Sequence, residues 1–247
     1  MTQWIRCLTV FLAALLITGV VSAETLKVGS DITFPPFEYI DPSTGEPTGF
    51  DIELIKAIGA TMNVDVEIVH SPWDNIFNRL FDGEFDVIVS ALSITEARAE
   101  VMELSEPYFV TGQVIVARAD DPSIRGPEDL IGKKVAVRSG TTSVDAAVAL
   151  ALDRIVYFDE WSDVFTALES GEVDAALSDE IFAASEVQRR PDQFRLAGDR
   201  VTAEPYGIAA RKGETELIQR INEALAALRA DGTYQALYEK WIGAIEP

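Results

Sequence analysis

The sequence contains little of the chemistry that metalloproteins and hydrolytic enzymes use. Among its 247 residues there is one cysteine, Cys7, and one histidine, His70. A single cysteine excludes an internal disulfide, and a single histidine argues against most zinc sites and a Ser-His-Asp triad. His70 follows a predicted strand, so we expect a structural role for it. We therefore expect neither a metal nor a cofactor.

Basic residues are also few. The chain has 20 lysines and arginines against 41 acidic residues, and its formal net charge is −21. Nucleic acids and anionic lipids carry the same sign of charge and are excluded as natural partners. The sequence has no calcium-binding loop pattern, so we interpret the acidity as a source of solubility.

Long apolar runs are absent after the start of the chain. The only one covers residues 8–21, follows Arg6, and ends in Val21-Ser22-Ala23. A basic start, a short apolar run and a small-x-small site predict a signal peptide over residues 1–23. An uncleaved anchor is the alternative, although the run is short for a membrane span. We expect an exported, soluble protein whose residues 24–247 can bury a core without disulfides.

One stretch of the sequence occurs twice. Residues 73–90 (WDNIFNRLFDGEFDVIVS) reappear as residues 161–178 (WSDVFTALESGEVDAALS). Each copy predicts an amphipathic helix, a glycine turn and a short buried strand that ends in serine. Chance is the alternative, because such units are common in α/β proteins. Two copies of one architecture would face each other across a cleft, with strand ends directed at a ligand.

Alternating short strands and helices run through the rest of the chain and predict an α/β fold. Helical spacing is clear over 50–62 and 217–229, and Thr95 is a predicted N-cap. We predict that the apolar strand over 112–119 crosses between two lobes and that 206–210 carries the chain back. The predicted division is 24–111 plus 203–247 for lobe 1 and 112–202 for lobe 2.

Polar groups follow several of the predicted strands. In most proteins each would be an ordinary loop side chain, but strand ends of open α/β sheets are also where ligands bind. Their coincidence at equivalent ends favours a binding site. The residues concerned are Asp31, Ser90 with Ser93, Thr141 with Thr142, and Asp179.

Two of these places suit opposite charges. Residues 139–142 (SGTT) precede a predicted helix, whose free N–H groups suit a carboxylate or phosphate, and they lack the P-loop pattern. Arg98 would add a bidentate contact, unless it pairs on a helix surface with Glu96 or Glu100. Asp179 suits an ammonium group, unless it caps the following segment.

Aromatic side chains accompany the polar groups. Phe34 and Trp73 lie in polar, proline-containing loops, where their ring faces could bind a flat or cationic group. Cation–π attraction would contribute about 0.5–2 kcal/mol to the binding free energy. Core packing is the alternative, and we expect it for Trp161, the repeat partner of Trp73. Asp31, close to Phe34 in the sequence, would place a charge at the far end of the ligand.

The chain resembles the family 3 periplasmic solute-binding proteins, which serve ABC importers of polar amino acids. The resemblance covers nearly all of the sequence after residue 23, and six loose motifs carry it in order. They are DITFPPFEY (31–39), GFDIEL (49–54), SALSITEAR (90–98), SGTT (139–142), VDAALSD (173–179) and LRADGTY (228–234).

The resemblance implies a periplasmic binding protein-like fold of type II, in which two Rossmann-like lobes joined by two hinge strands close on a ligand. It also implies residue roles. Arg98, Ser93 and the Thr142 amide would hold an α-carboxylate, and Asp179 with the Ser90 region would hold an α-amino group. The ligand side chain would meet Asp31, Phe34 and Trp73.

Two positions complicate the choice of ligand. Ala91 stands where binders of basic amino acids often have a second serine. Arg138 lies near the side-chain end of the site and would disfavour a lysine-like ligand unless Asp31 offsets it. We expect a polar or cationic L-amino acid, arginine-like first and glutamine-like second, with acidic amino acids possible through Arg138. The expected protein is a periplasmic monomer that delivers this solute to an inner-membrane ABC permease.

Two other functions fit the same scaffold. Periplasmic prephenate or arogenate (cyclohexadienyl) dehydratases resemble this family and use a carboxyl group as general acid, a role open to Asp179 or Glu180. A sensor domain is the other alternative; because the sequence ends at Pro247 without a second apolar run, we expect such a sensor to act in trans.

Overall fold

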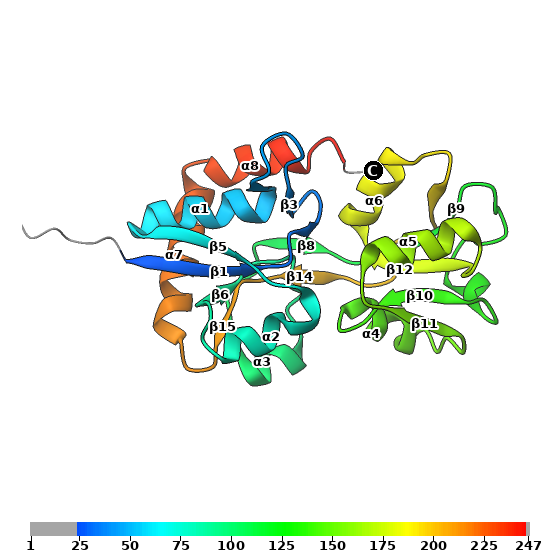
Figure 1. Ribbon diagram of the computed structural model, residues 1–247, viewed down its shortest axis with the longest axis horizontal. Coiled ribbons are helices and arrows are strands. Elements are labelled where there is room, and N and C mark those ends of the chain that lie inside the picture. Colours follow the sequence, from blue (N-terminus) through cyan, green and yellow to red (C-terminus); the bar gives the residue numbers. More distant parts are fainter. Residues whose placement is uncertain (1–23, 246–247) are drawn as a thin grey trace, which may run out of the picture.

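A computed structural model describes residues 24–245. The predicted signal peptide over 1–23 therefore lies outside the described residues. The described chain forms two α/β lobes side by side, with a narrow waist between them (Figure 1). Among these residues, no helix combines the length and the apolar character needed to cross a bilayer.

The first lobe is built on a five-stranded sheet in the order β5-β1-β6-β15-β7. Its strands are β1 (Thr25–Ser30), β5 (Asp65–His70), β6 (Val87–Ile88), β7 (Met102–Leu104) and β15 (Ala209–Arg211). β1 runs parallel to both β5 and β6, whereas β15 is antiparallel to both β6 and β7. A small sheet of β2 (Thr33–Phe34), β3 (Glu38–Ile40) and β4 (Pro47–Thr48) lies beside it.

The second lobe repeats this plan. Its sheet has the order β11-β10-β12-β9-β13. The strands are β9 (Gln113–Arg118), β10 (Val135–Arg138), β11 (Ile155–Phe158), β12 (Ala175–Asp179) and β13 (Phe194–Ala197). β10 is parallel to β11 and β12, and β9 is antiparallel to β12 and β13. Position by position, the two sheets have the same strand directions.

The sequence repeat occupies equivalent places in the two lobes. The first copy forms α2 (Trp73–Phe81) and β6, and the second forms α5 (Trp161–Ser170) and β12. The glycines of the two turns, Gly83 and Gly171, have φ values of 77° and 76°, a left-handed conformation that glycine adopts without steric cost. The predicted common architecture is confirmed.

Helices cover both faces of each sheet (Figure 1). In the first lobe, α1 (Phe50–Met62), α7 (Thr215–Ala230) and α8 (Thr233–Trp241) share one core, and α2 packs on the other face near α3 (Glu96–Val101). In the second lobe, α4 (Thr142–Ala149) packs on one face, and α5 with α6 (Glu180–Arg189) on the other. A short 3₁₀ helix (Pro127–Leu130) completes the described helices.

Strand alternation explains how one sheet serves two cores. In β10, Val135 and Val137 face the α4 side, whereas Ala136 faces the core of α5 and α6. Successive side chains of a strand point to opposite faces, so a strand that is apolar throughout can be buried on both. The carboxyl ends of the parallel strands thereby remain free to reach the space between the lobes.

Two short strands connect the lobes. β8 (Phe109–Thr111) pairs antiparallel with β14 (Glu204–Tyr206) at the waist of Figure 1. The prediction that 112–119 forms the crossing strand is wrong, because β9 is an inner strand of the second sheet. The predicted return over 206–210 is also displaced: β14 makes the crossing, and β15 already belongs to the first sheet. Apolar composition could not separate the connecting strand from the sheet strand that follows it directly.

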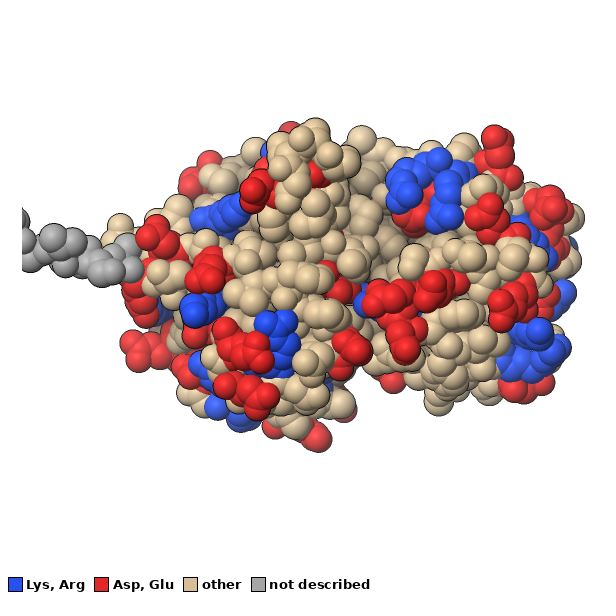
Figure 2. All heavy atoms as spheres, in the orientation of Figure 1, with Lys and Arg blue, Asp and Glu red and all other residues tan. Residues whose placement is uncertain are grey.

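Acidic side chains are distributed over both lobes on the face shown in Figure 2, with basic ones interspersed. This pattern agrees with a net charge of −21 spread over the surface. A hollow separates the two lobes on this face.

Candidate functional site

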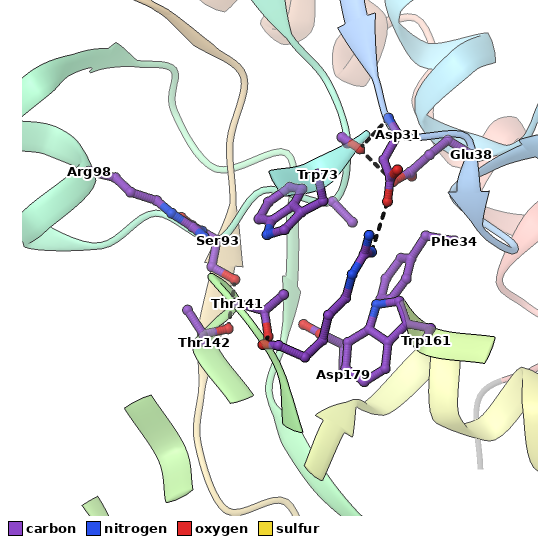
Figure 3. A pocket seen from close by; sticks show the side chains of 13 residues that line it. Asp31, Phe34, Glu38, Trp73, Ser93, Arg98, Thr141, Thr142, Trp161 and Asp179 are labelled. Atoms are coloured by element: carbon purple, nitrogen blue, oxygen red, sulfur yellow. Dashed lines mark hydrogen bonds and ion pairs between the residues drawn. The ribbon is translucent and has the colours of Figure 1, made fainter. Parts of the chain in front are cut away.

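A pocket lies between the lobes, and all ten residues singled out in the sequence line it. These are Asp31, Phe34, Trp73, Ser90, Ala91, Ser93, Arg98, Arg138, Thr142 and Asp179. Glu38, Thr141 and Trp161 complete the lining. Figure 3 shows these side chains converging from both lobes.

Four strand ends supply the centre of the pocket. Asp31 follows β1, Ser90 follows β6, Arg138 ends β10 and Asp179 ends β12. In the shared topology, β1 corresponds to β10 and β6 to β12. The carboxyl ends of equivalent strands therefore face each other across the waist, as open α/β sheets require for a shared ligand site.

Arg98 lies at one pole of the pocket. Thr95 caps α3, because its hydroxyl accepts a hydrogen bond from the Arg98 main-chain N–H at 3.2 Å. The guanidinium donates to the carbonyl of Ser93 at 2.8 Å and to that of Gly140 at 3.3 Å. The predicted alternative, a surface pair with Glu96 or Glu100, is not among the ion pairs of the described residues.

Burial and aromatic contact shape the chemistry of Arg98. Its guanidinium carbon lies 5.4 Å from the ring centroid of Trp73 and 5.5 Å from that of Phe77. Burial lowers the pKa of Arg98 from its ordinary value, and the nearby Asp179 carboxylate opposes that effect. The result is a partly desolvated cation whose remaining donors suit a carboxylate.

Two hydroxyl groups lie beside this cation. Ser93 comes from the first lobe and Thr142 begins α4 in the second, and their oxygens are 3.3 Å apart. Both donate to Oε2 of Glu204 on the connecting strand β14, at 2.9 Å and 2.5 Å. Thr202 donates to the other oxygen of Glu204 at 2.7 Å. The described structure thus already places a carboxylate against these two hydroxyls.

Asp179 lies at the other side of the pocket (Figure 3). Its side chain does not cap α6; it accepts a hydrogen bond from the Tyr206 hydroxyl at 2.6 Å. Burial raises the pKa of Asp179 to about 6, and the Tyr206 hydrogen bond limits the rise. A buried carboxylate whose hydrogen-bond partners are neutral is a favourable neighbour for an ammonium group.

Arg138 and Asp31 form a buried ion pair across the pocket. Nη1 of Arg138 lies 2.8 Å from Oδ2 of Asp31, and the two side chains are 3 % and 4 % exposed. The dashed line beneath Asp31 in Figure 3 marks this contact. The pair joins the second lobe to the first at the end of the pocket assigned to a ligand side chain.

A hydrogen-bonded network supports Asp31 and the Ser90 region from behind. Ser90 accepts from the Asp31 main-chain N–H at 3.0 Å and donates to Glu38 at 2.9 Å. Ala91, at a left-handed φ of 45°, donates its N–H to Asp51 at 2.7 Å. Burial and the nearby Asp51 carboxyl raise the pKa of Glu38 well above its ordinary value.

Aromatic rings form the wall of the pocket. Phe34 stacks on Phe182 with 4.1 Å between ring centroids, and its centroid lies 5.9 Å from that of Trp161. The Trp73 indole N–H donates to the Gly140 carbonyl of the second lobe at 3.2 Å. Trp161 packs in the core as expected, but it also lines the pocket.

Sequence reasoning did not assign three polar or aromatic groups of this region to the site: Glu38, Trp161 and Glu204. Two signals could have found some of them. Trp161 is the repeat partner of Trp73, and Glu38 lies inside the DITFPPFEY motif. Glu204 had no such signal, because its importance comes from strand β14 placing it between the lobes. No group of three metal-ligating side chains gathers within residues 24–245.

Comparison with known proteins agrees with this architecture. Residues 26–244 match the bacterial extracellular solute-binding proteins, family 3. The chain is 31 % identical to the L-cystine-binding protein TcyJ of Escherichia coli K12, over 93 % of this chain and 86 % of that protein. It is 30 % identical to the ABC transporter arginine-binding protein 1 of the same organism, over 93 % and 97 %.

Solved structures give the same result. An ancestral arginine-binding protein bound to glutamine is 42 % identical, with a TM-score of 0.83, over 89 % of this chain and 98 % of that one. The ancestral amino acid-binding protein AncCDT-1, a precursor of cyclohexadienyl dehydratase, is 38 % identical, with a TM-score of 0.79, over 88 % and 95 %. The chain therefore belongs to family 3 of the bacterial extracellular solute-binding proteins.

Proposed function

We propose that this protein captures a polar L-amino acid in the periplasm and delivers it to an ABC importer of the inner membrane, acting as a monomer. The observation that carries this proposal is the presence of two opposite charges, the half-buried Arg98 and the buried Asp179, in one pocket between the lobes. They come from residues 24–111 plus 203–247 and from residues 112–202, which we propose as the two bodies that close on the solute.

The carboxylate pole is Arg98 with its neighbouring hydroxyls. The guanidinium is held by the carbonyls of Ser93 and Gly140, one from each lobe. A ligand carboxylate here would receive charge-assisted hydrogen bonds from Arg98, and from the first main-chain N–H groups of α4 near Thr142. It would exchange places with the Glu204 carboxylate as the acceptor for the two hydroxyls.

The ammonium pole is Asp179. Its second carboxylate oxygen is free of the Tyr206 hydrogen bond and is available to the α-amino group. Closure removes both ligand charges from water, which is unfavourable unless each gains a partner. A zwitterion satisfies both poles at once, so it stabilises the closed arrangement more than the open one.

The side-chain end is defined by Asp31, Arg138 and the aromatic wall. The sequence placed an arginine-like ligand first and a glutamine-like ligand second. Both share the head group that Arg98 and Asp179 would bind. The buried Asp31–Arg138 ion pair bears on the choice between them.

A thermal-shift screen over the twenty amino acids tests this function. At a thousandfold excess over its Kd, the ligand should stabilise the protein by about 4 kcal/mol. Calorimetry on each positive compound then gives the affinity, and size-exclusion chromatography gives the oligomeric state. If no amino acid shifts the melting temperature, the proposal is wrong.

A dehydratase activity is the second candidate, favoured by the pKa of about 6 of Asp179, which leaves part of this buried carboxyl protonated near neutral pH. Glu180 is less suited to act as the acid because it pairs with Arg200 and is absent from the pocket lining. Incubation with prephenate distinguishes the candidates, since phenylpyruvate formation would show catalysis.

A further inference from the structure

Arg138 brings the chain's own guanidinium into the pocket. It extends from the end of β10 and reaches Asp31 across the waist at 2.8 Å. The two side chains are almost completely buried, at 3 % and 4 % exposure. A cation on the protein therefore already occupies the place beside Asp31 that a cationic ligand side chain would need.

The second lobe holds Arg138 in this position by its own contacts. Nε donates to the carbonyl of Asp159 at 2.8 Å, and Nη2 lies 3.4 Å from a carboxylate oxygen of Glu160. The main-chain N–H of Arg138 donates to the Ser143 hydroxyl at 3.2 Å. With two of its side-chain nitrogens engaged on partners of its own lobe, the guanidinium is oriented towards Asp31 independently of the first lobe.

The first lobe fixes Asp31 in the same way. Its Oδ2 accepts a second hydrogen bond from the Thr33 hydroxyl at 2.8 Å, and its main-chain N–H donates to Ser90 at 3.0 Å. One carboxylate oxygen thus serves both Thr33 and Arg138. A ligand guanidinium that approached Oδ2 would have to displace Arg138 from an oxygen that already accepts two hydrogen bonds.

We propose that Arg138 is a specificity-determining residue that takes the place of a cationic ligand side chain and restricts the site to amino acids with a short, uncharged polar side chain, glutamine-like rather than arginine-like. This inference rests on the proposed function. It reverses the order of ligands expected from the sequence, and the reversal follows from a pairing between residues far apart in the chain.

The charges at this end of the pocket support this selection. A cationic side chain would meet the fixed guanidinium at short range in a buried site, and an anionic one would meet Asp31 and Glu160. An amide can accept a hydrogen bond from Arg138 and donate one to Asp31. Repulsion of the wrong ligand is an effective route to selectivity.

Calorimetry with glutamine and arginine on the full mature protein and on Arg138→Ala tests the inference. The wild type should bind glutamine at least tenfold more tightly than arginine. In Arg138→Ala the order should reverse, with arginine affinity at least tenfold higher than in the wild type, because Asp31 then lacks its internal partner. The double variant Asp31→Asn/Arg138→Ala removes both buried charges and should show no gain for arginine.

Arg118→Ala is the matched control. Arg118 also donates to main-chain carbonyls inside the second lobe, those of Leu168 and Val173, but it does not line the pocket. Its removal should leave the glutamine-to-arginine ratio unchanged. A melting temperature measured for every variant, with and without arginine, shows whether Arg138→Ala folds and whether arginine restores its stability.

The outcomes separate this inference from the proposed function. If the wild type binds arginine as tightly as glutamine, or if Arg138→Ala gains no arginine affinity, Arg138 does not set the specificity although amino acids still bind. If neither the wild type nor any variant binds an amino acid, the proposed function itself fails.

Discussion

The charged side chains of the pocket differ in whether an opposite charge of the protein neutralises them. Arg98 has two carbonyl partners and two aromatic neighbours, and Asp179 has one hydroxyl partner. Neither forms an ion pair within the described residues at the distances of a salt bridge. Arg138 and Asp31, in contrast, neutralise each other. Arg98 and Asp179 are therefore the charges that gain most from a zwitterionic ligand.

Removal of Arg98 should abolish most of the binding. Arg98→Ala leaves the ligand carboxylate buried without its cation, which costs about 3–5 kcal/mol, or at least a hundredfold in affinity. Isothermal titration with the best amino acid of the screen measures this loss. Arg118→Ala serves again as the control with unchanged affinity. Near-normal binding by Arg98→Ala would remove this residue from the site.

Acidification should weaken binding through Asp179. Its pKa in the free protein is raised from 3.8 to about 6, mainly by burial, so the carboxylate that an ammonium needs is present above pH 6 and is lost below it. Affinity should fall by roughly tenfold per pH unit as pH decreases below 6. Titrations between pH 5 and 8 check this expectation.

The same raised pKa has the opposite sign for the stability of the free protein. Burying the charged form is unfavourable, so the contribution of this group improves as pH falls from 6 towards 3.8. Asp179→Asn should flatten both pH dependences. Asp51, whose pKa is also raised to about 6, is still present in that variant, so a pH dependence that persists unchanged would point to Asp51 instead.

Short elements position these side chains. α3 spans only Glu96–Val101, and the Thr95 hydroxyl holds its start through the main-chain N–H of Arg98. β8 and β14 each have three residues. Because such short elements depend on few contacts, substitutions at their ends should change the positions of the pocket side chains and hence the ligand affinity.

Loss of the α3 cap should affect both stability and binding. Thr95→Ala should decrease the unfolding free energy by about 1 kcal/mol. It should also weaken ligand binding several-fold, because the first turn of α3 sets the position of Arg98. Thr95→Ser keeps the accepting hydroxyl and should behave like the wild type. Urea unfolding and calorimetry measure the two effects. Reduced stability with unchanged affinity would show that the cap does not position Arg98.

The elements also show how far the sequence predicts the site. Periodicity identified α1 and α7, and the repeat identified equivalent units in the two lobes, because both depend on local patterns. The position of the connecting strands was missed, since Phe109–Thr111 and Gln113–Arg118 form almost one apolar run. The family resemblance placed Arg138 and Asp31 at the same end of the site, but their direct contact and the role of Glu204 depend on segments far apart in the chain, for which one sequence carries no direct signal.

At the scale of the whole molecule, few covalent connections join two large bodies. The lobes are linked by β8 and β14, while contacts such as Trp73 to Gly140 and Arg138 to Asp31 cross the pocket. Rotation about two short strands changes few core contacts in either lobe. Domain closure about these strands is therefore the motion that the architecture favours.

Ligand binding should make the protein more compact. Small-angle scattering should show a smaller radius of gyration with the preferred amino acid than without it, and Trp73 fluorescence should change at the same ligand concentration. Trp73→Phe should reduce the fluorescence change, with Trp161 of the same pocket supplying the remainder, while the scattering change persists. Identical scattering curves with and without a ligand that binds by calorimetry would exclude closure.

Glu204 should influence the ligand concentration at which the two lobes close. Its carboxylate receives hydroxyl hydrogen bonds from Ser93 of one lobe and Thr142 of the other, and it does so from the connecting strand itself. The carboxylate of a bound amino acid would therefore have to compete with the Glu204 carboxylate for the hydroxyl groups of Ser93 and Thr142. If the proposed function holds, the side chain at position 204 sets the concentration of free solute at which the pocket becomes half occupied.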